Sequence, residues 1–185
     1  MTPPYPVLNA LAYQCAWLAT VMSAANGHGW YTMPIALAQV GWHLARSEQV
    51  RSETGLLLCI SGAGLMLDQM VLGTGWIQFT GDANASDRVP LWMAGIWLSF
   101  ATTFNGALAW LQRRYWLAIG LAGLGGPLAY WAAARMGALV IVDLQATCLA
   151  YGMGFALLVP AGLAGASFLQ QRPGHASASH AEHTQ

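Results

Sequence analysis

Six apolar stretches, each close to the length that crosses a lipid bilayer, dominate this 185-residue sequence. About 20 consecutive apolar residues in a helix are needed to cross a hydrocarbon core of about 30 Å. The stretches lie at 7–25, 31–45, 55–72, 91–111, 115–134 and 145–168. This pattern predicts an all-α fold, a polytopic transmembrane helical bundle of about six spans, with five as the alternative count.

The composition favours lipid over water as the surroundings of such a bundle. Only 8% of the residues are charged and 56% are hydrophobic, whereas a typical soluble domain has about 25% charged residues. The formal net charge is zero, which argues against nucleic acid as a partner, since nucleic acid requires a concentrated basic face. The three cysteines lie inside apolar stretches without metal-ligand spacing, so we predict no disulfide, metal or other cofactor.

The expected domain organisation is simple. One transmembrane domain should occupy residues 1–169, and a disordered cytoplasmic tail rich in Ser, Ala and His should follow over 170–185. The last apolar region begins at Ala138 and exceeds one straight span. It predicts either one long tilted helix or an interfacial segment that leads into a helix from about Gln145.

Two polar connections should lie outside the hydrocarbon. The stretch 46–54 carries four charged side chains and is expected in water or among lipid headgroups. The connection 73–90 is too polar to span. Three of its apolar side chains are expected at the membrane interface, where aromatic rings are favoured: Trp76, Ile77 and Phe79.

The arginines predict the orientation, because cytoplasmic loops of membrane proteins carry an excess of basic residues. If the amino terminus is inside, the cytoplasmic segments hold Arg46, Arg51, Arg113, Arg114 and Arg172, and the outer segments hold Arg88 and Arg135. This excess favours a cytoplasmic location for both termini.

Asp68 is the clearest candidate for a functional residue, because an ionisable group inside a membrane is costly unless it is paired or hydrated. It lies in the expected outer half of the third stretch, with Gly64 and Ser61 four and seven residues earlier on the same helix face. Two interpretations stay open. Asp68 is either a proton- or substrate-binding carboxylate or a structural carboxylate hydrogen-bonded to a neighbouring helix.

Other polar side chains form two more groups. Thr102 and Asn105 share a stripe of the predicted fourth helix, either as contacts between helices or as the lining of a polar cavity. Gln39, His43 and Arg46 follow one face of the second helix. His43 is expected near the cytoplasmic surface as an interfacial hydrogen-bonding group.

Asp143 and Arg135 fall near the outer ends of the sixth and fifth helices. They form either a local ion pair or, with Asp68, a shared polar cluster. A functional site is expected if the polar candidates of the third, fourth and sixth helices converge on one cavity. An accessory role is expected if each faces a different packed neighbour.

A resemblance to a known family is carried by Pro90-Leu91-Trp92, the run from Leu98 to Leu111, the segment around Asp68, Gln78-Phe79 and the run from Gly126 to Tyr130. These residues resemble the family called domain of unknown function 2878, over nearly the whole chain up to about Gly165. The Phe-Ala-Thr-Thr-x-Asn core is its specific part. In the family pattern a His and a Ser often follow that Asn, whereas this chain has Gly106 and Ala107. Any role of that His therefore does not carry over.

The resemblance implies a small protein of the bacterial inner membrane, but no activity. Genes of the family are similar in their setting to genes for membrane-lipid modification. This similarity points toward the lipid chemistry of the envelope.

Three functions remain open. The sequence has no Gly-x-Ser-x-Gly motif, Walker loop or His-Glu-x-x-His motif, so the leading hypothesis is a non-catalytic accessory or lipid-interacting protein. The alternatives are a small permease that uses Asp68, together with Asn105, as an intramembrane site, and a membrane-embedded lipid-modifying enzyme. The expected partners are membrane lipids and either a second copy of the chain or another membrane protein.

Overall fold

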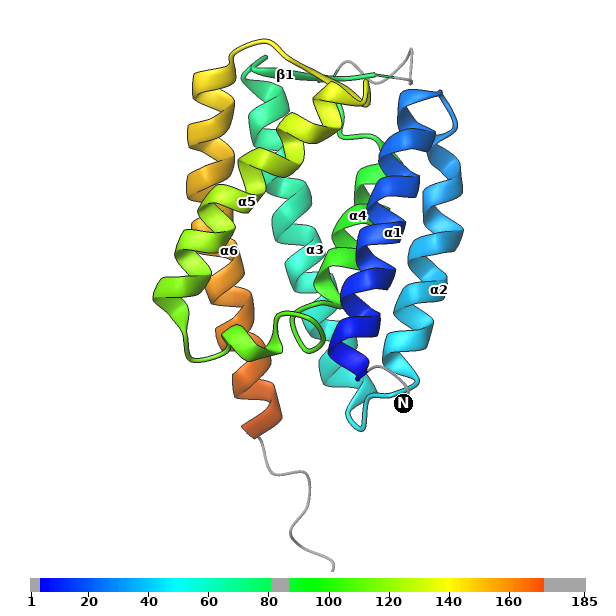
Figure 1. Cartoon of the computed structure of the whole chain (residues 1–185), viewed down its shortest axis with the longest axis vertical. Coiled ribbons are helices and arrows are strands. Elements are labelled where there is room, and N and C mark those ends of the chain that lie inside the picture. Colours follow the sequence, from blue (N-terminus) through cyan, green and yellow to red (C-terminus); the bar gives the residue numbers. More distant parts are fainter. Residues whose placement is uncertain (1–3, 81–86, 172–185) are drawn as a thin grey trace, which may run out of the picture.

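Six α-helices stand side by side in the part of the chain that the structure describes (Figure 1). The computed structural model describes residues 4–80 and 87–171. The helices are α1 (Tyr5–Ala25), α2 (Thr32–Leu44), α3 (Val50–Gly73), α4 (Leu91–Ala101), α5 (Tyr115–Arg135) and α6 (Leu144–Gln171), with 3-10 turns η1 (Gly29–Tyr31) and η2 (Ala109–Leu111). The predicted all-α bundle is confirmed.

The helices differ in how far they can reach. Four of those described, α1, α3, α5 and α6, are long and apolar enough to cross a membrane. The other two, α2 and α4, have 13 and 11 residues, which at 1.5 Å per residue gives about 20 Å and about 17 Å. Both are shorter than the hydrocarbon core of about 30 Å. Four of the six predicted spans therefore have a helix of sufficient length.

Successive helices run in opposite directions, so the start of α1 and the end of α6 lie at the same end of the bundle (Figure 1). We call this the terminal end. The predicted disordered tail lies, from residue 172 onward, outside the described residues.

A small antiparallel sheet closes the opposite end, which we call the strand end. Strands β1 (Ile77–Phe79) and β2 (Leu139–Ile141) pair so that Ile77 faces Ile141. Each strand follows a helix, and a glycine with positive φ lies two residues after the end of that helix, Gly75 at 77° and Gly137 at 90°. This conformation favours glycine after a helix. The sequence did not predict this sheet. The Ile77 side chain, expected at a membrane interface, is fully buried in the core.

The sheet also decides between the two predictions for the region that begins at Ala138. The chain is not one long helix there, because β2 comes first and α6 begins at Leu144. Asp143 caps the start of α6, since its Oδ1 accepts a hydrogen bond of 2.9 Å from the backbone N–H of Ala146.

The helix predicted over 91–111 is wrong in its second half, because α4 ends at Ala101 and turns follow over 102–108. The hydroxyl groups of Thr102 and Thr103 donate to the backbone carbonyls three residues earlier, at 2.7 Å and 2.6 Å. Such bonds compete with the backbone donors that would continue the helix. The predicted helical stripe of Thr102 and Asn105 is therefore absent.

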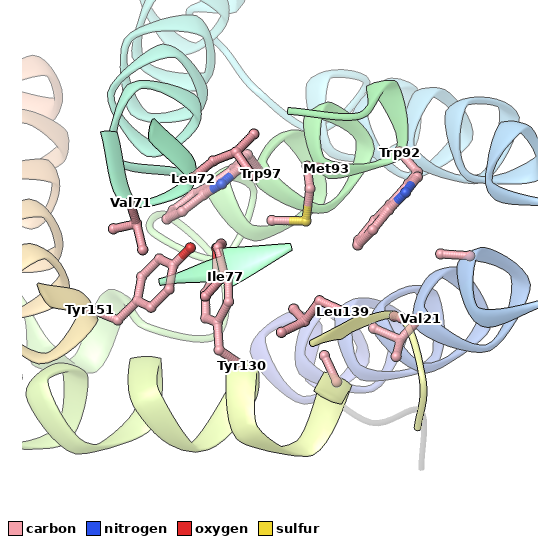
Figure 2. Close-up of a cluster of buried hydrophobic side chains, with 13 residues drawn as sticks. Val21, Val71, Leu72, Ile77, Trp92, Met93, Trp97, Tyr130, Leu139 and Tyr151 are labelled. Carbon is pink, nitrogen blue, oxygen red and sulfur yellow. The ribbon is translucent and has the colours of Figure 1, made fainter. Parts of the chain in front are cut away.

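The interior contains two clusters of buried apolar side chains. The larger cluster lies at the strand end, and Figure 2 shows its tyrosine and tryptophan rings around the strands. The smaller cluster, nearer the terminal end, includes Leu57, Phe104 and Leu163. The polar side chains described next lie between and beside these clusters.

Candidate functional site

His43 and Glu53 form a buried hydrogen-bonded pair at the terminal end. They belong to the last turn of α2 and the first turn of α3, and Nε2 of His43 lies 2.6 Å from Oε1 of Glu53. His43 is 4% exposed and Glu53 is 9% exposed. The hydroxyl of Tyr5, at the start of α1, lies 2.5 Å from Nδ1 of His43. Both nitrogens of the imidazole ring are therefore engaged.

Asn105 holds the second oxygen of Glu53. Its Nδ2 donates to Oε2 of Glu53 at 2.7 Å, while its Oδ1 accepts from Gln112 at 3.1 Å and from Gln170 at 2.8 Å. An amide donates only through its nitrogen, so the two glutamines orient the Asn105 amide with its NH₂ group toward Glu53. We call the six side chains Tyr5, His43, Glu53, Asn105, Gln112 and Gln170 the Glu53 network.

A polar pocket of about 520 Å³ opens beside the Glu53 network and is also lined by the connection between α2 and α3. Arg46 is its basic group. The guanidinium carbon of Arg46 lies 4.5 Å from the centre of the Trp42 ring and 5.9 Å from that of Tyr5. Stacking on aromatic faces favours a cation at this position. The pocket thus combines an arginine, a tyrosine hydroxyl, the shielded carboxylate of Glu53 and the exposed carboxylate of Glu48.

An apolar groove of about 910 Å³ runs between α3 and α6 and meets the polar pocket. Ser52 of α3 and Leu169 of α6 line both. Along α3 the groove lining extends from Ser52 to Met70, which corresponds to about 27 Å of helix. Its floor includes small residues, among them Gly55 and Gly165. The polar pocket and the apolar groove therefore form one continuous site, polar at the terminal end and apolar along α3 and α6.

Thr102 belongs to a separate buried cluster. Its hydroxyl oxygen accepts hydrogen bonds from the amides of Asn9 and Gln39, both at 3.2 Å. The Oδ1 atom of Asn9 also accepts the backbone N–H of Ala107 at 3.0 Å. The amide of Asn9 approaches Gly106 so closely that a Cβ atom there would lie 2.3 Å from it. This cluster fastens the turns after α4 to α1 and α2.

Asp68 lies in a third place, near the strand end, and is fully buried. Its Oδ2 accepts the indole N–H of Trp97 at 2.6 Å, and its Oδ1 accepts the hydroxyl groups of Tyr151, at 3.0 Å, and Tyr130. The rings of Tyr130 and Tyr151 stack with 3.6 Å between centres, and Figure 2 shows both reaching toward Trp97. A Cβ atom at Gly64 would lie 2.1 Å from Trp97, so the small residue expected beside Asp68 admits its indole donor.

Asp143 joins none of these groups. It is exposed at the start of α6, and its role in the described part of the chain is the helix cap noted above. Neither predicted arrangement is found there, because the ion pair within 4.0 Å among the described residues is that of His43 with Glu53. The candidates from the sequence thus occupy separate places: Asp143 at the surface, Asp68 in the core, Thr102 and Gln39 in one cluster, and His43 and Asn105 in the Glu53 network.

Several residues of these clusters were not predicted. Glu53 was assigned to a stretch in water, but α3 begins at Val50 and carries it into the bundle. The available signal was the presence of His43 and Glu53 at the two ends of a short connection between helices. Asn9 was a lone amide in an apolar stretch, the same criterion that selected Asn105. Tyr130 and Tyr151 carry no charge, so nothing in their sequence context separates them from other buried aromatic residues.

The comparisons with known proteins give one match. The family model described as "Protein of unknown function (DUF2878)" matches residues 6–161, well over half of the chain. The searches of curated proteins and of solved structures found no match.

Proposed function

The chain belongs to the DUF2878 family, and from the geometry of its own site we propose that it is a lipid-binding protein of the bacterial inner membrane. The family description assigns no activity, so the proposal depends on the described residues. Among the functions open from the sequence, it corresponds to the lipid-interacting protein.

The observation that carries this proposal is the junction of the polar pocket with the apolar groove at Ser52 and Leu169. An amphipathic lipid needs both environments in this order. Its acyl chain would lie in the groove between α3 and α6. Van der Waals packing against the groove would hold it there, because a lipid tail within the bilayer is already in apolar surroundings. Its headgroup would lie in the pocket, where Arg46 supplies a positive charge for a phosphate.

The arrangement of the helices supports a position in the bilayer with this pocket at the cytoplasmic surface. Four helices are long and apolar enough to cross. Arg46, Arg51, Arg113 and Arg114 belong to connections or helix starts at the terminal end, and basic residues predominate on the cytoplasmic side of membrane proteins. Both termini would then be cytoplasmic, as proposed from the sequence.

A substitution that fills the groove tests the proposal. Gly55 lines the groove, and a Cβ atom there would meet no other atom within 4 Å, so Gly55→Leu should occupy the lipid position without disturbing the helix packing. Delipidated protein in detergent would be titrated with palmitoyl-oleoyl phosphatidylglycerol, and the bound lipid counted by native mass spectrometry. We expect saturable binding to the unsubstituted protein and a clear loss in Gly55→Leu.

Gly62 provides a matched control. It lies on the same helix, has equally open space around its Cβ position, and does not belong to the groove lining. Gly62→Leu should bind the lipid like the unsubstituted chain. Equal binding by both variants would contradict the assignment of the lipid to this groove.

A further inference from the structure

We infer that Tyr5 is a general base for a hydroxyl group of the bound lipid headgroup, activated through His43 and Glu53. The location of the ligand rests on the proposed function, but the activation of Tyr5 rests on the network alone. The observations are the hydrogen bonds of 2.5 Å and 2.6 Å on the two sides of one imidazole ring and the pocket that Tyr5 lines.

The direction of these hydrogen bonds follows from the donors and acceptors. Glu53, as a carboxylate, accepts at both oxygens, and the oriented amide of Asn105 fills one of them. Nε2 of His43 must then donate to the other. We infer a ring with this single proton, which leaves Nδ1 as the acceptor for the hydroxyl of Tyr5. The proton of Tyr5 therefore points toward a base, and its oxygen lone pairs remain for a group in the pocket.

A hydroxyl group followed by a histidine and a carboxylate is the arrangement that activates nucleophiles and bases in enzymes. Here the tyrosine replaces the usual serine. Tyr5 would touch the ligand, whereas His43 and Glu53 act as positioning residues behind it.

The proton transfer balances without any additional reactant. The headgroup O–H bond breaks and its proton passes to the oxygen of Tyr5, while the proton of Tyr5 passes to Nδ1 of His43. The products are a headgroup alkoxide and an imidazolium. The carboxylate of Glu53 stabilises the imidazolium, and Arg46, stacked beside the Tyr5 ring, lies where it would stabilise the alkoxide.

The chemistry of the pocket indicates the class of ligand. A phospholipid with hydroxyl groups in its head, such as phosphatidylglycerol, offers a phosphate to Arg46 and a hydroxyl to Tyr5. A lipid that lacks the hydroxyl would satisfy Arg46 alone.

Reactivity toward an aryl sulfonyl fluoride tests the activation of Tyr5 in the full-length protein. An oxygen–sulfur bond forms at the tyrosine, the sulfur–fluorine bond breaks, fluoride leaves, and the phenolic proton passes to His43. Tyr31 and Tyr115 are internal controls because they are 47% and 38% exposed, more than the half-buried Tyr5. We expect Tyr5 to be labelled about tenfold faster or more than either control, since a positioned base typically contributes at least about 100-fold.

Two variants separate activation from simple access. Glu53→Gln and His43→Gln should reduce labelling at Tyr5 to the rate of the control tyrosines while leaving the rates at Tyr31 and Tyr115 unchanged. Labelling at Tyr5 that is no faster than at the controls, or that persists in both variants, would overturn the inference. Nitrogen NMR of the unsubstituted protein adds a measurement that does not depend on whether the variants fold. The ring of His43 should carry its proton on Nε2, and a proton on Nδ1 would also overturn it.

The same labelling reaction tests the ligand. Saturation with phosphatidylglycerol should protect Tyr5, and phosphatidic acid, which lacks the alcohol hydroxyl groups of the headgroup glycerol, should protect it less. Equal protection by both lipids, or no protection, would overturn the assignment of the hydroxyl to Tyr5. Fast labelling of Tyr5 in a protein that binds no lipid would contradict the proposed function and leave the activated tyrosine in place.

Discussion

At the scale of single residues, the buried polar groups of this protein are distinguished by how fully their partners surround them. Asp68 has hydrogen-bond donors on both oxygens, supplied by α4, α5 and α6. A carboxylate in an apolar interior is tolerated when such donors replace water. This arrangement favours the structural interpretation of Asp68 and provides no support for a permease site.

Removal of one donor to Asp68 should destabilise the fold. Tyr151→Phe leaves the packing of the ring almost unchanged but removes the hydroxyl that donates to Oδ1 at 3.0 Å. We expect a loss of about 1–3 kcal/mol in the free energy of unfolding, since a buried acceptor loses a partner. Thermal unfolding in detergent measures it, with Tyr115→Phe at an exposed position as the control. Equal stability of the two variants would show that the hydroxyl of Tyr151 contributes nothing to holding Asp68.

The sequence predicted individual residues unevenly, and the reason is physical. Asp68, His43 and Asn105 could be selected because polar groups in apolar stretches must find partners. Their partners could not be selected, because Trp97 and Tyr151 look the same in sequence whether they fill space or donate hydrogen bonds. Glu53 was misplaced because its charge suggested water, whereas His43 and Asn105 surround it.

At the scale of elements, side-chain hydrogen bonds explain where hydropathy failed. The apolar run 91–111 has the length of a span. Yet α4 ends at Ala101, where the hydroxyl groups of Thr102 and Thr103 bond to backbone carbonyls. A hydropathy scale reports how unfavourable water is for a side chain, and it does not detect this competition for backbone hydrogen-bonding groups. The starts of α1, α5 and α6 lie within two residues of the predicted starts. Hydropathy sufficed to place these helices.

Asn9 and Gly106 should be energetically coupled, because the amide of Asn9 occupies the space that a side chain at Gly106 would need. We expect Gly106→Ala to destabilise the protein strongly in the unsubstituted background and much less in the Asn9→Gly background. A double-mutant cycle of unfolding free energies should give a coupling of about 0.5–3 kcal/mol. Additive effects would mean that Asn9 does not hold the turns after α4.

At the scale of the whole molecule, the repeated apolar stretches sufficed to predict the helical bundle, whereas the sheet at the strand end could not be predicted. The strand residues form pairs with partners at least 60 positions away, such as Ile77 with Ile141. A three-residue strand has no periodic pattern of its own to recognise. The proposed site was likewise only partly visible, because its pocket depends on which helix ends come together.

The proposed orientation predicts which end of the bundle faces the cytoplasm. In a chain whose three native cysteines are replaced by serine, Val142→Cys at the strand end should react with a membrane-impermeant maleimide in intact cells lacking an outer membrane. Ser47→Cys, in the connection at the terminal end, should react only after the membrane is permeabilised. The reverse pattern would invert the topology, and labelling of both residues in intact cells would contradict it.

The sheet at the strand end also has a mechanical consequence. The ladder joins the chain leaving α3 to the chain entering α6, through contacts such as the 2.8 Å hydrogen bond from Val142 to the carbonyl of Trp76. Because the sheet joins α3 and α6 at the strand end, the two helices can separate only at the terminal end. We therefore expect α3 and α6 to separate at Ser52 and Leu169. A lipid held between them would then enter tail first and leave headgroup first, through the end of the bundle that holds Tyr5.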